Sequence, residues 1–174
     1  AKDKIMMGAE RRSMVMTTEQ KEMTAYHEAG HALVGMTLPK CDPVYKATII
    51  PRGGALGMVM SLPEMDRLNM FKDECHQRLA MTMAGKAAEI HKYGPDSVSN
   101  GPAGDIMQAS SLARAMVLRW GMSDKVGNID YSEAAEGYSG RTGGFSVSAN
   151  TKEMIEEEVQ KFIQDGYDWA LKII

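Results

Sequence analysis

The stretch TTEQKEMTAYHEAGHALVGMTL, residues 17–38, decides the fold, because its local signals predict one long helix around which the other elements are arranged. Thr17, followed three residues later by Gln20, matches a capping box, in which each side chain hydrogen-bonds the other residue's backbone at a helix N-terminus. Pro39 cannot continue a helix because it lacks a backbone N–H group. We therefore predict a helix that begins at Thr17 or Thr18 and ends before Pro39.

The middle of this helix carries His27-Glu28-Ala29-Gly30-His31, which is the HExxH pattern of zinc hydrolases. An α-helix turns about 100° and rises about 1.5 Å per residue, so the two histidines lie on one face of it. Both imidazole rings can then bind one zinc ion, and Glu28 can reach water at the metal as a general base. A catalytic zinc site leaves one coordination position for water, so a third protein ligand is needed.

Gly30, inside this motif, costs helix stability relative to alanine. It is either a tolerated small residue or the point at which another backbone or helix approaches closely. The sequence leaves both interpretations open.

The third ligand is not determined by spacing. The extended pattern HExxHxxGxxH is absent, because Val34 and Thr37 stand where it requires glycine and histidine. A carboxylate from a later segment is the common alternative. Asp105 is favoured because it follows a glycine-containing loop and has a short side chain, although aspartate at a helix start is often only a cap. The carboxylate candidates are Glu64, Asp66, Glu74, Glu89 and Asp105.

The composition is that of an ordinary globular domain, with 174 residues of which 44% are hydrophobic and 25% charged. A net charge of −3 argues against nucleic acid as a partner. No apolar run approaches the length of a membrane span, and no Walker A loop is present, so we expect no ATP binding here. Cys41 and Cys75 lack metal-binding spacing, which favours reduced thiols and disfavours a closed structural zinc site.

The other segments predict a mainly α-helical (α+β) domain with a small β-sheet or hairpin after the HExxH helix. Residues 1–16 are interpreted as a connector, and 122–148 as a rim loop or a partly disordered segment. The expected elements are strands at 44–50 and 56–62, a helix within 66–93, a polar loop at 97–104, a helix from Asp105 to about Trp120, and a last helix at 150–174.

Several stretches together resemble the peptidase domain of the FtsH family of membrane-anchored AAA+ ATP-dependent zinc metalloproteases. The similarity extends over nearly the whole chain, from Asp3 to about Ile174. The stretches are ERRSMVMTTEQKEMTAYHEAGHALV (10–34), ATIIPRGGALGMVMSLPE (47–64), MAGKAAE (83–89), SVSNGPAGDI (97–106) and LARAMVLRWGMSDKVG (112–127). The loop before Asp105 departs from the usual family pattern TTGAxxD.

The resemblance implies a zinc site formed by His27, His31 and Asp105, with Glu28 as the catalytic base. It also implies that unfolded polypeptide lies along an edge strand at Leu56, Gly57, Met58, Val59 and Met60. Residues 1–16 would link a preceding ATPase module to a C-terminally truncated peptidase domain, residues 17–174.

For the full-length protein, the resemblance implies a homohexamer at the cytoplasmic face of the inner membrane, anchored only by segments N-terminal to this chain. The fragment itself is expected to be soluble. The alternative function is a ring-forming assembly module whose site is silent.

Overall fold

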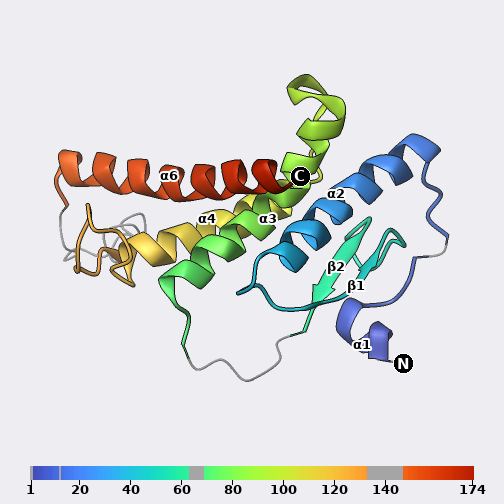
Figure 1. Cartoon of the computed structure of the whole chain (residues 1–174), viewed down its shortest axis with the longest axis horizontal. Coiled ribbons are helices and arrows are strands. Elements are labelled where there is room, and N and C mark those ends of the chain that lie inside the picture. Colours follow the sequence, from blue (N-terminus) through green and yellow to red (C-terminus); the bar gives the residue numbers. More distant parts are fainter. Residues whose placement is uncertain (1, 12, 63–68, 133–146) are drawn as a thin grey trace, which may run out of the picture.

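The computed structural model describes residues 2–11, 13–62, 69–132 and 147–174, which form a helical domain with one two-stranded antiparallel sheet (Figure 1). The predicted fold class is confirmed. The elements are α1 (Lys2–Met7), α2 (Thr18–Thr37), β1 (Val44–Thr48), β2 (Met58–Ser61), α3 (Lys72–Tyr93), the 3-10 helix η1 (Pro95–Ser97), α4 (Ala103–Leu118) and α6 (Ala149–Ile173). Among these residues, no helix combines the length and apolar character that crossing a bilayer requires.

Helix α2 begins and ends as its sequence predicts. Thr17 is the N-cap: its hydroxyl accepts a hydrogen bond from the Gln20 backbone at 3.1 Å, and the Gln20 side chain accepts one from the Thr17 backbone at 3.0 Å. At the other end Leu38 is extended and Pro39 follows. The capping box is confirmed, and it fixes the start of the helix that carries HEAGH.

The hairpin after α2 is shorter than the sequence predicts. Its strands pair antiparallel from Val44 opposite Ser61 to Thr48 opposite Met58, with an irregularity near Lys46. The expected strands at 44–50 and 56–62 were therefore too long. The chain leaves β1 after Thr48 and forms bends before β2, because a tight turn at residues 52–55 occupies the connection.

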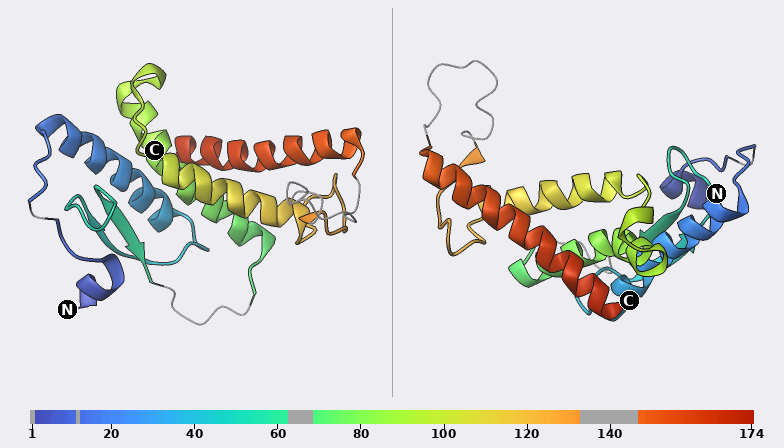
Figure 2. Two further views of the ribbon diagram at one scale, coloured as in Figure 1. Left: turned by 180° about the vertical axis from the view of Figure 1, so that it is seen from behind. Right: turned by 90° about the horizontal axis from the view of Figure 1, so that it is seen from above.

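Helix α3 is central and contacts α2, α4 and α6. In Figure 1 it lies between the α2–hairpin side and the α4–α6 side, and the view from behind in Figure 2 shows α4 running alongside it. The helix expected within 66–93 is present, but the described residues 69–71, which the prediction included, are not helical. It begins at Lys72, because Glu74 caps the backbone N–H of Phe71, and the Phe71 side chain is exposed. Residues 63–68 and 133–146 lie outside the described part. Asp66 and most of the loop predicted at 122–148 therefore lie outside it as well.

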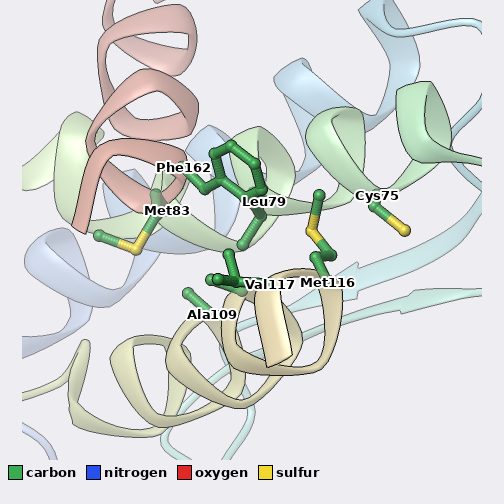
Figure 3. Close-up of a cluster of buried hydrophobic side chains, with 8 residues drawn as sticks. Cys75, Leu79, Met83, Ala109, Met116, Val117 and Phe162 are labelled. Carbon is green, nitrogen blue, oxygen red and sulfur yellow. The ribbon is translucent and has the colours of Figure 1, made fainter. Parts of the chain in front are cut away.

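The apolar core between α3, α4 and α6 holds the domain together on the side away from the hairpin (Figure 3). Its buried residues are Cys75, Leu79, Met83, Ala109, Ala113, Met116, Val117 and Phe162. Burying side chains of this size stabilises a fold by roughly 1.5–3 kcal/mol for each large one. Cys75 is buried, and the half-buried Cys41 thiol donates to the carbonyl oxygen of Gln77 at 3.7 Å.

The contact between α2 and α3 depends on small residues. A Cβ atom placed on Gly30 would lie 2.5 Å from the carbonyl oxygen of Ala84 and 2.7 Å from the Cβ of Ala88. Both distances are well inside van der Waals contact, so the helices could not approach this closely with any other residue at position 30. The interpretation of Gly30 as a point of close helix approach is confirmed.

Replacing Gly30 by alanine is therefore expected to destabilise the metal-free protein by about 1–3 kcal/mol, despite the better helix propensity of alanine. Urea denaturation in the presence of a chelator measures this. Gly104→Ala in α4 is the matched control, because a Cβ there meets nothing within 4 Å. The control is expected to keep or gain stability. Equal stability of the two variants would contradict the close-approach account.

Candidate metal centre

The two histidines of α2 face the same point. His27 and His31 are one helical turn apart, and their Nε2 atoms lie 3.1 Å from each other. Both side chains are mostly shielded, with 13% and 12% of their side-chain surface exposed. The i, i+4 spacing places the rings on one face, and the packing of α2 on α3 holds that face inward.

A hydrogen bond at the opposite ring nitrogen fixes the orientation of each imidazole. His31 Nδ1 lies 2.7 Å from the carbonyl oxygen of Met81, which can only accept, so this nitrogen carries a proton. His27 Nδ1 lies 2.9 Å from the carboxylate of Glu89. In the neutral rings, the Nε2 atoms then present lone pairs toward each other, which is the orientation of a metal-binding histidine pair.

Asp105 comes to the same point from the start of α4. Its Oδ2 lies 3.1 Å from His27 Nε2 and 3.3 Å from His31 Nε2. The sequence predicts that Asp105 is the first residue of this helix, and this is wrong. Helix α4 begins two residues earlier, at Ala103, and is preceded by Pro102. Asp105 is thus in the first turn, where the positive end of the helix dipole favours an anionic side chain.

The loop before Asp105 is tied to α3 through Glu89. The backbone N–H and the hydroxyl of Ser99 both donate to the Glu89 carboxylate, at 2.8 and 3.1 Å. Ser99 also accepts a hydrogen bond from the backbone of Gly101 at 3.0 Å. Glu89 therefore joins the loop that carries Asp105 to the ring of His27.

The three atoms form a triangle that suits a tetrahedral zinc ion. Zinc binds nitrogen and oxygen at about 2.0–2.2 Å, which separates neighbouring tetrahedral ligands by roughly 3.3 Å. The observed separations are 3.1, 3.1 and 3.3 Å. Asp105 Oδ2 is also buried and accepts no hydrogen bond among the described residues. Three lone-pair atoms at this distance repel each other unless a cation lies between them, so the residues present fit a zinc ion.

Two glycines leave room around this triangle. A Cβ on Gly85 of α3 would lie 2.4 Å from Cε1 of His27 and 2.5 Å from Nε2 of His31. A Cβ on Gly57, just before β2, would lie 2.7 Å from Cγ of Glu28. Any side chain at position 85 would displace the rings, and one at 57 would displace Glu28.

Charges around the site shift two of its pKa values in opposite directions. For Asp105, burial opposes ionisation, but in the absence of a metal His27 and His31 prevail when their rings are protonated, and they lower its pKa to about 2. For His27, burial alone would lower the pKa, but the carboxylates of Asp105 and Glu89 outweigh it and raise the value. The Asp105 carboxyl is therefore ionised at neutral pH and available as an anionic ligand.

Glu28 is buried beside the triangle, with 8% of its surface exposed. Burial raises its pKa above the usual carboxyl range, against the opposing influence of the two histidines. The nearby backbone of Val59 in β2 opposes this rise in pKa. A carboxylate with a raised pKa, next to a candidate metal position, has the properties of a general base.

Two of the other carboxylates considered from the sequence, Glu89 and Glu74, do not join the triangle. Glu89 contacts the Nδ1 side of His27 and therefore orients the ring, and Glu74 caps α3. Glu64 and Asp66 lie outside the described residues. Sequence reasoning missed the orienting role of Glu89. Its position among alanines on the buried stripe of α3 is a usable signal, because an isolated acidic residue there needs partners.

A cavity of about 1070 Å³ contains the triangle and Glu28. One of its walls is formed by Leu56, Gly57, Met58, Val59 and Ser61, so four of the five residues expected in the substrate strand line it, and Met60 does not. Leu56 and Gly57 form bends, so the strand itself begins only at Met58. Among the described residues, β2 pairs only with β1 and leaves its other edge without a partner strand.

Comparison with known proteins identifies a family model and several relatives that the chain resembles. Residues 14–174 match the model of peptidase family M41. The chain is 51% identical over its whole length to the ATP-dependent zinc metalloprotease FtsH of Rickettsia bellii, of which it covers 27%. It is 49% identical to the protein of that name from Caulobacter vibrioides and 47% to that from Photobacterium profundum, covering 28% and 25% of them. The chain thus spans about a quarter of the length of these curated relatives.

The convergent geometry predicts that Asp105→Asn weakens zinc binding by roughly 100-fold or more, because it removes an anionic ligand. Competition against a zinc-binding dye, with metal analysis after dialysis, measures this. Glu74→Gln is the matched control, since Glu74 lines the same cavity but lies outside the triangle. The control is expected to bind zinc as the wild type does. One zinc ion per chain of unchanged affinity in Asp105→Asn would exclude Asp105 as a ligand.

Proposed function

The chain belongs to peptidase family M41, and from this premise we propose that it is the zinc-dependent endopeptidase part of a larger ATP-dependent protease. The observation that carries this proposal is the convergence, beside Glu28, of two imidazole nitrogens and a buried carboxylate oxygen that accepts no hydrogen bond among the described residues. The relatives are named zinc metalloproteases, which supports zinc as the metal.

His27, His31 and Asp105 would hold the zinc ion. When bound, zinc supplies Lewis-acid chemistry, because it lowers the pKa of a coordinated water and polarises the scissile carbonyl. The protein keeps the two rings in the required tautomer through Met81 and Glu89. This fixed orientation avoids a rearrangement of ligands during the reaction.

Glu28 is the general base in this proposal. It takes a proton from the attacking water and can return a proton to the leaving amine. The raised pKa of its buried carboxyl brings its proton affinity closer to neutral pH, which suits both steps. Gly57 leaves the space that this side chain occupies.

The substrate is an extended, unfolded polypeptide that pairs, at Met58, Val59 and Met60, with the edge of β2 that has no partner strand among the described residues. Main-chain pairing provides affinity with little dependence on side chains, which suits degradation of many proteins. Two features support this arrangement. The edge lines the same cavity as the candidate ligands, and the hairpin contacts Glu28 through Gly57 and Val59.

For the whole protein we propose a membrane-anchored homohexamer on the cytoplasmic face of the inner membrane, in which an ATPase module delivers unfolded substrate. Large apolar side chains exposed on this chain support subunit contacts in such an assembly. Those with more than 60% of their surface exposed are Ile5, Val15, Met36, Phe71 and Met107. An assembly role alone, with a silent site, is the competing function.

Glu28→Gln is expected to lower cleavage of an unstructured, internally quenched peptide by at least about 100-fold, because proton transfer to a positioned base is lost. The variant keeps a hydrogen-bonding side chain of the same size, so zinc content is expected to be unchanged. Fluorescence of the quenched peptide and metal analysis of the same sample measure the two effects together.

The control for this experiment is Glu74→Gln, which is expected to keep both activity and zinc. Cleavage by Glu28→Gln at the wild-type rate would remove Glu28 from the mechanism. A wild-type chain that contains zinc but cleaves no unstructured peptide would favour the assembly function.

A further inference from the structure

The segment before α2 packs against the substrate-side hairpin. We define the N-terminal arm as residues 3–11, which include most of α1 and lie beside the hairpin in Figure 1. Met7 of the arm is 4% exposed, and Asp3 forms a half-exposed ion pair with Lys46 of β1. The backbone of Arg11 donates to the carbonyl of Pro51 at 2.8 Å. The arm is therefore attached to the connection between the two strands.

Arg52 is the centre of this attachment. Its side chain is 5% exposed, which is rare for arginine unless its charge is paired. The guanidinium forms an ion pair with Glu10 and donates from Nη1 to the carbonyl oxygen of Gly8 at 3.1 Å. Both partners belong to the arm, so the buried charge of Arg52 is compensated by the arm.

The backbone of Arg52 also closes the turn that leads into β2. Its N–H donates to the carbonyl of Ala55, and the N–H of Ala55 donates back to Arg52, both at 3.0 Å. Two residues later comes Gly57, which lies so close to Glu28 that a Cβ would be 2.7 Å from its Cγ. The turn that Arg52 closes is therefore followed closely in the chain by the residue that packs against Glu28.

We propose that Arg52 is a positioning residue whose ion pair with Glu10 locks the arm onto the turn 52–55 and holds the β2 edge in place for the peptide substrate. The inference rests on the proposed function, because it concerns the strand to which substrate binds. An ion pair with a second hydrogen bond fixes both distance and direction, which apolar packing of Met7 alone would not. A strand held in its binding position loses less entropy on pairing with peptide.

The test uses the zinc-loaded Glu28→Gln chain, which binds peptide without cleaving it. A fluorescein-labelled unstructured peptide is titrated, and anisotropy gives its affinity. Adding Glu10→Gln, which removes the charge but keeps the size, is expected to weaken binding by at least about threefold. The Glu10 side chain is 27% exposed, so this substitution disturbs buried packing less than a substitution of the 5% exposed Arg52 would. Zinc content and melting of the zinc-loaded protein are recorded for each variant.

Two further variants in the same background make the result specific. Glu10→Asp keeps the charge and is expected to bind peptide more tightly than Glu10→Gln. A purely steric role of Glu10 predicts the opposite order, because glutamine keeps the size of glutamate and aspartate is shorter. Lys125→Gln removes a comparable but exposed Lys–Glu pair, with Glu157 at 2.7 Å, away from the arm. This control is expected to leave peptide affinity unchanged.

The outcomes separate this inference from the function on which it rests. Peptide affinity of Glu10→Gln within threefold of its parent would overturn the inference and leave the edge-strand function standing. Loss of zinc together with affinity would also overturn it, since the effect would then act through the metal centre. No binding by the Glu28→Gln parent itself would overturn the edge-strand function and this inference with it.

Discussion

The close approach of α2 and α3 at Gly30 is the constraint on which the rest of the structure depends. A Cβ on Gly30 would lie 2.5 Å from the carbonyl oxygen of Ala84, so the two helices lie nearer than a side chain at this position would allow. This proximity brings the imidazoles over Gly85 and places the Met81 carbonyl and Glu89 beside their Nδ1 atoms. The same contact that builds the fold therefore orients the candidate ligands.

The site concentrates negative charge in a mostly buried region. Glu28, Glu89 and Asp105 surround two histidines, and Glu89 is 1% exposed. Hydrogen bonds from Ser99 and His27 satisfy Glu89, whereas the buried Asp105 Oδ2 accepts none among the described residues. A divalent cation bound by Asp105 would remove this imbalance, since buried carboxylates are costly without a counter-charge. The electrostatics and the geometry thus agree on the position of the ion.

Local signals in the sequence predicted those features that depend on neighbours in the chain. The capping box at Thr17 and the shared face of the two histidines follow from spacing alone, and both are present. The start of α3 was misplaced, because an apolar period continued through Phe71, a side chain that the fold leaves exposed. Spacing could not choose among the carboxylates, since their distances from α2 are set by helix packing. Family resemblance, and not spacing, pointed to Asp105.

The central claim is that two imidazoles and one carboxylate hold a zinc ion whose coordination is completed by water. X-ray absorption spectroscopy at the zinc edge of the zinc-loaded wild-type chain tests it most directly. The account predicts two imidazole rings and additional oxygen ligands at about 2.0–2.2 Å. A sulfur shell at about 2.3 Å, or scattering from a single imidazole, would contradict it.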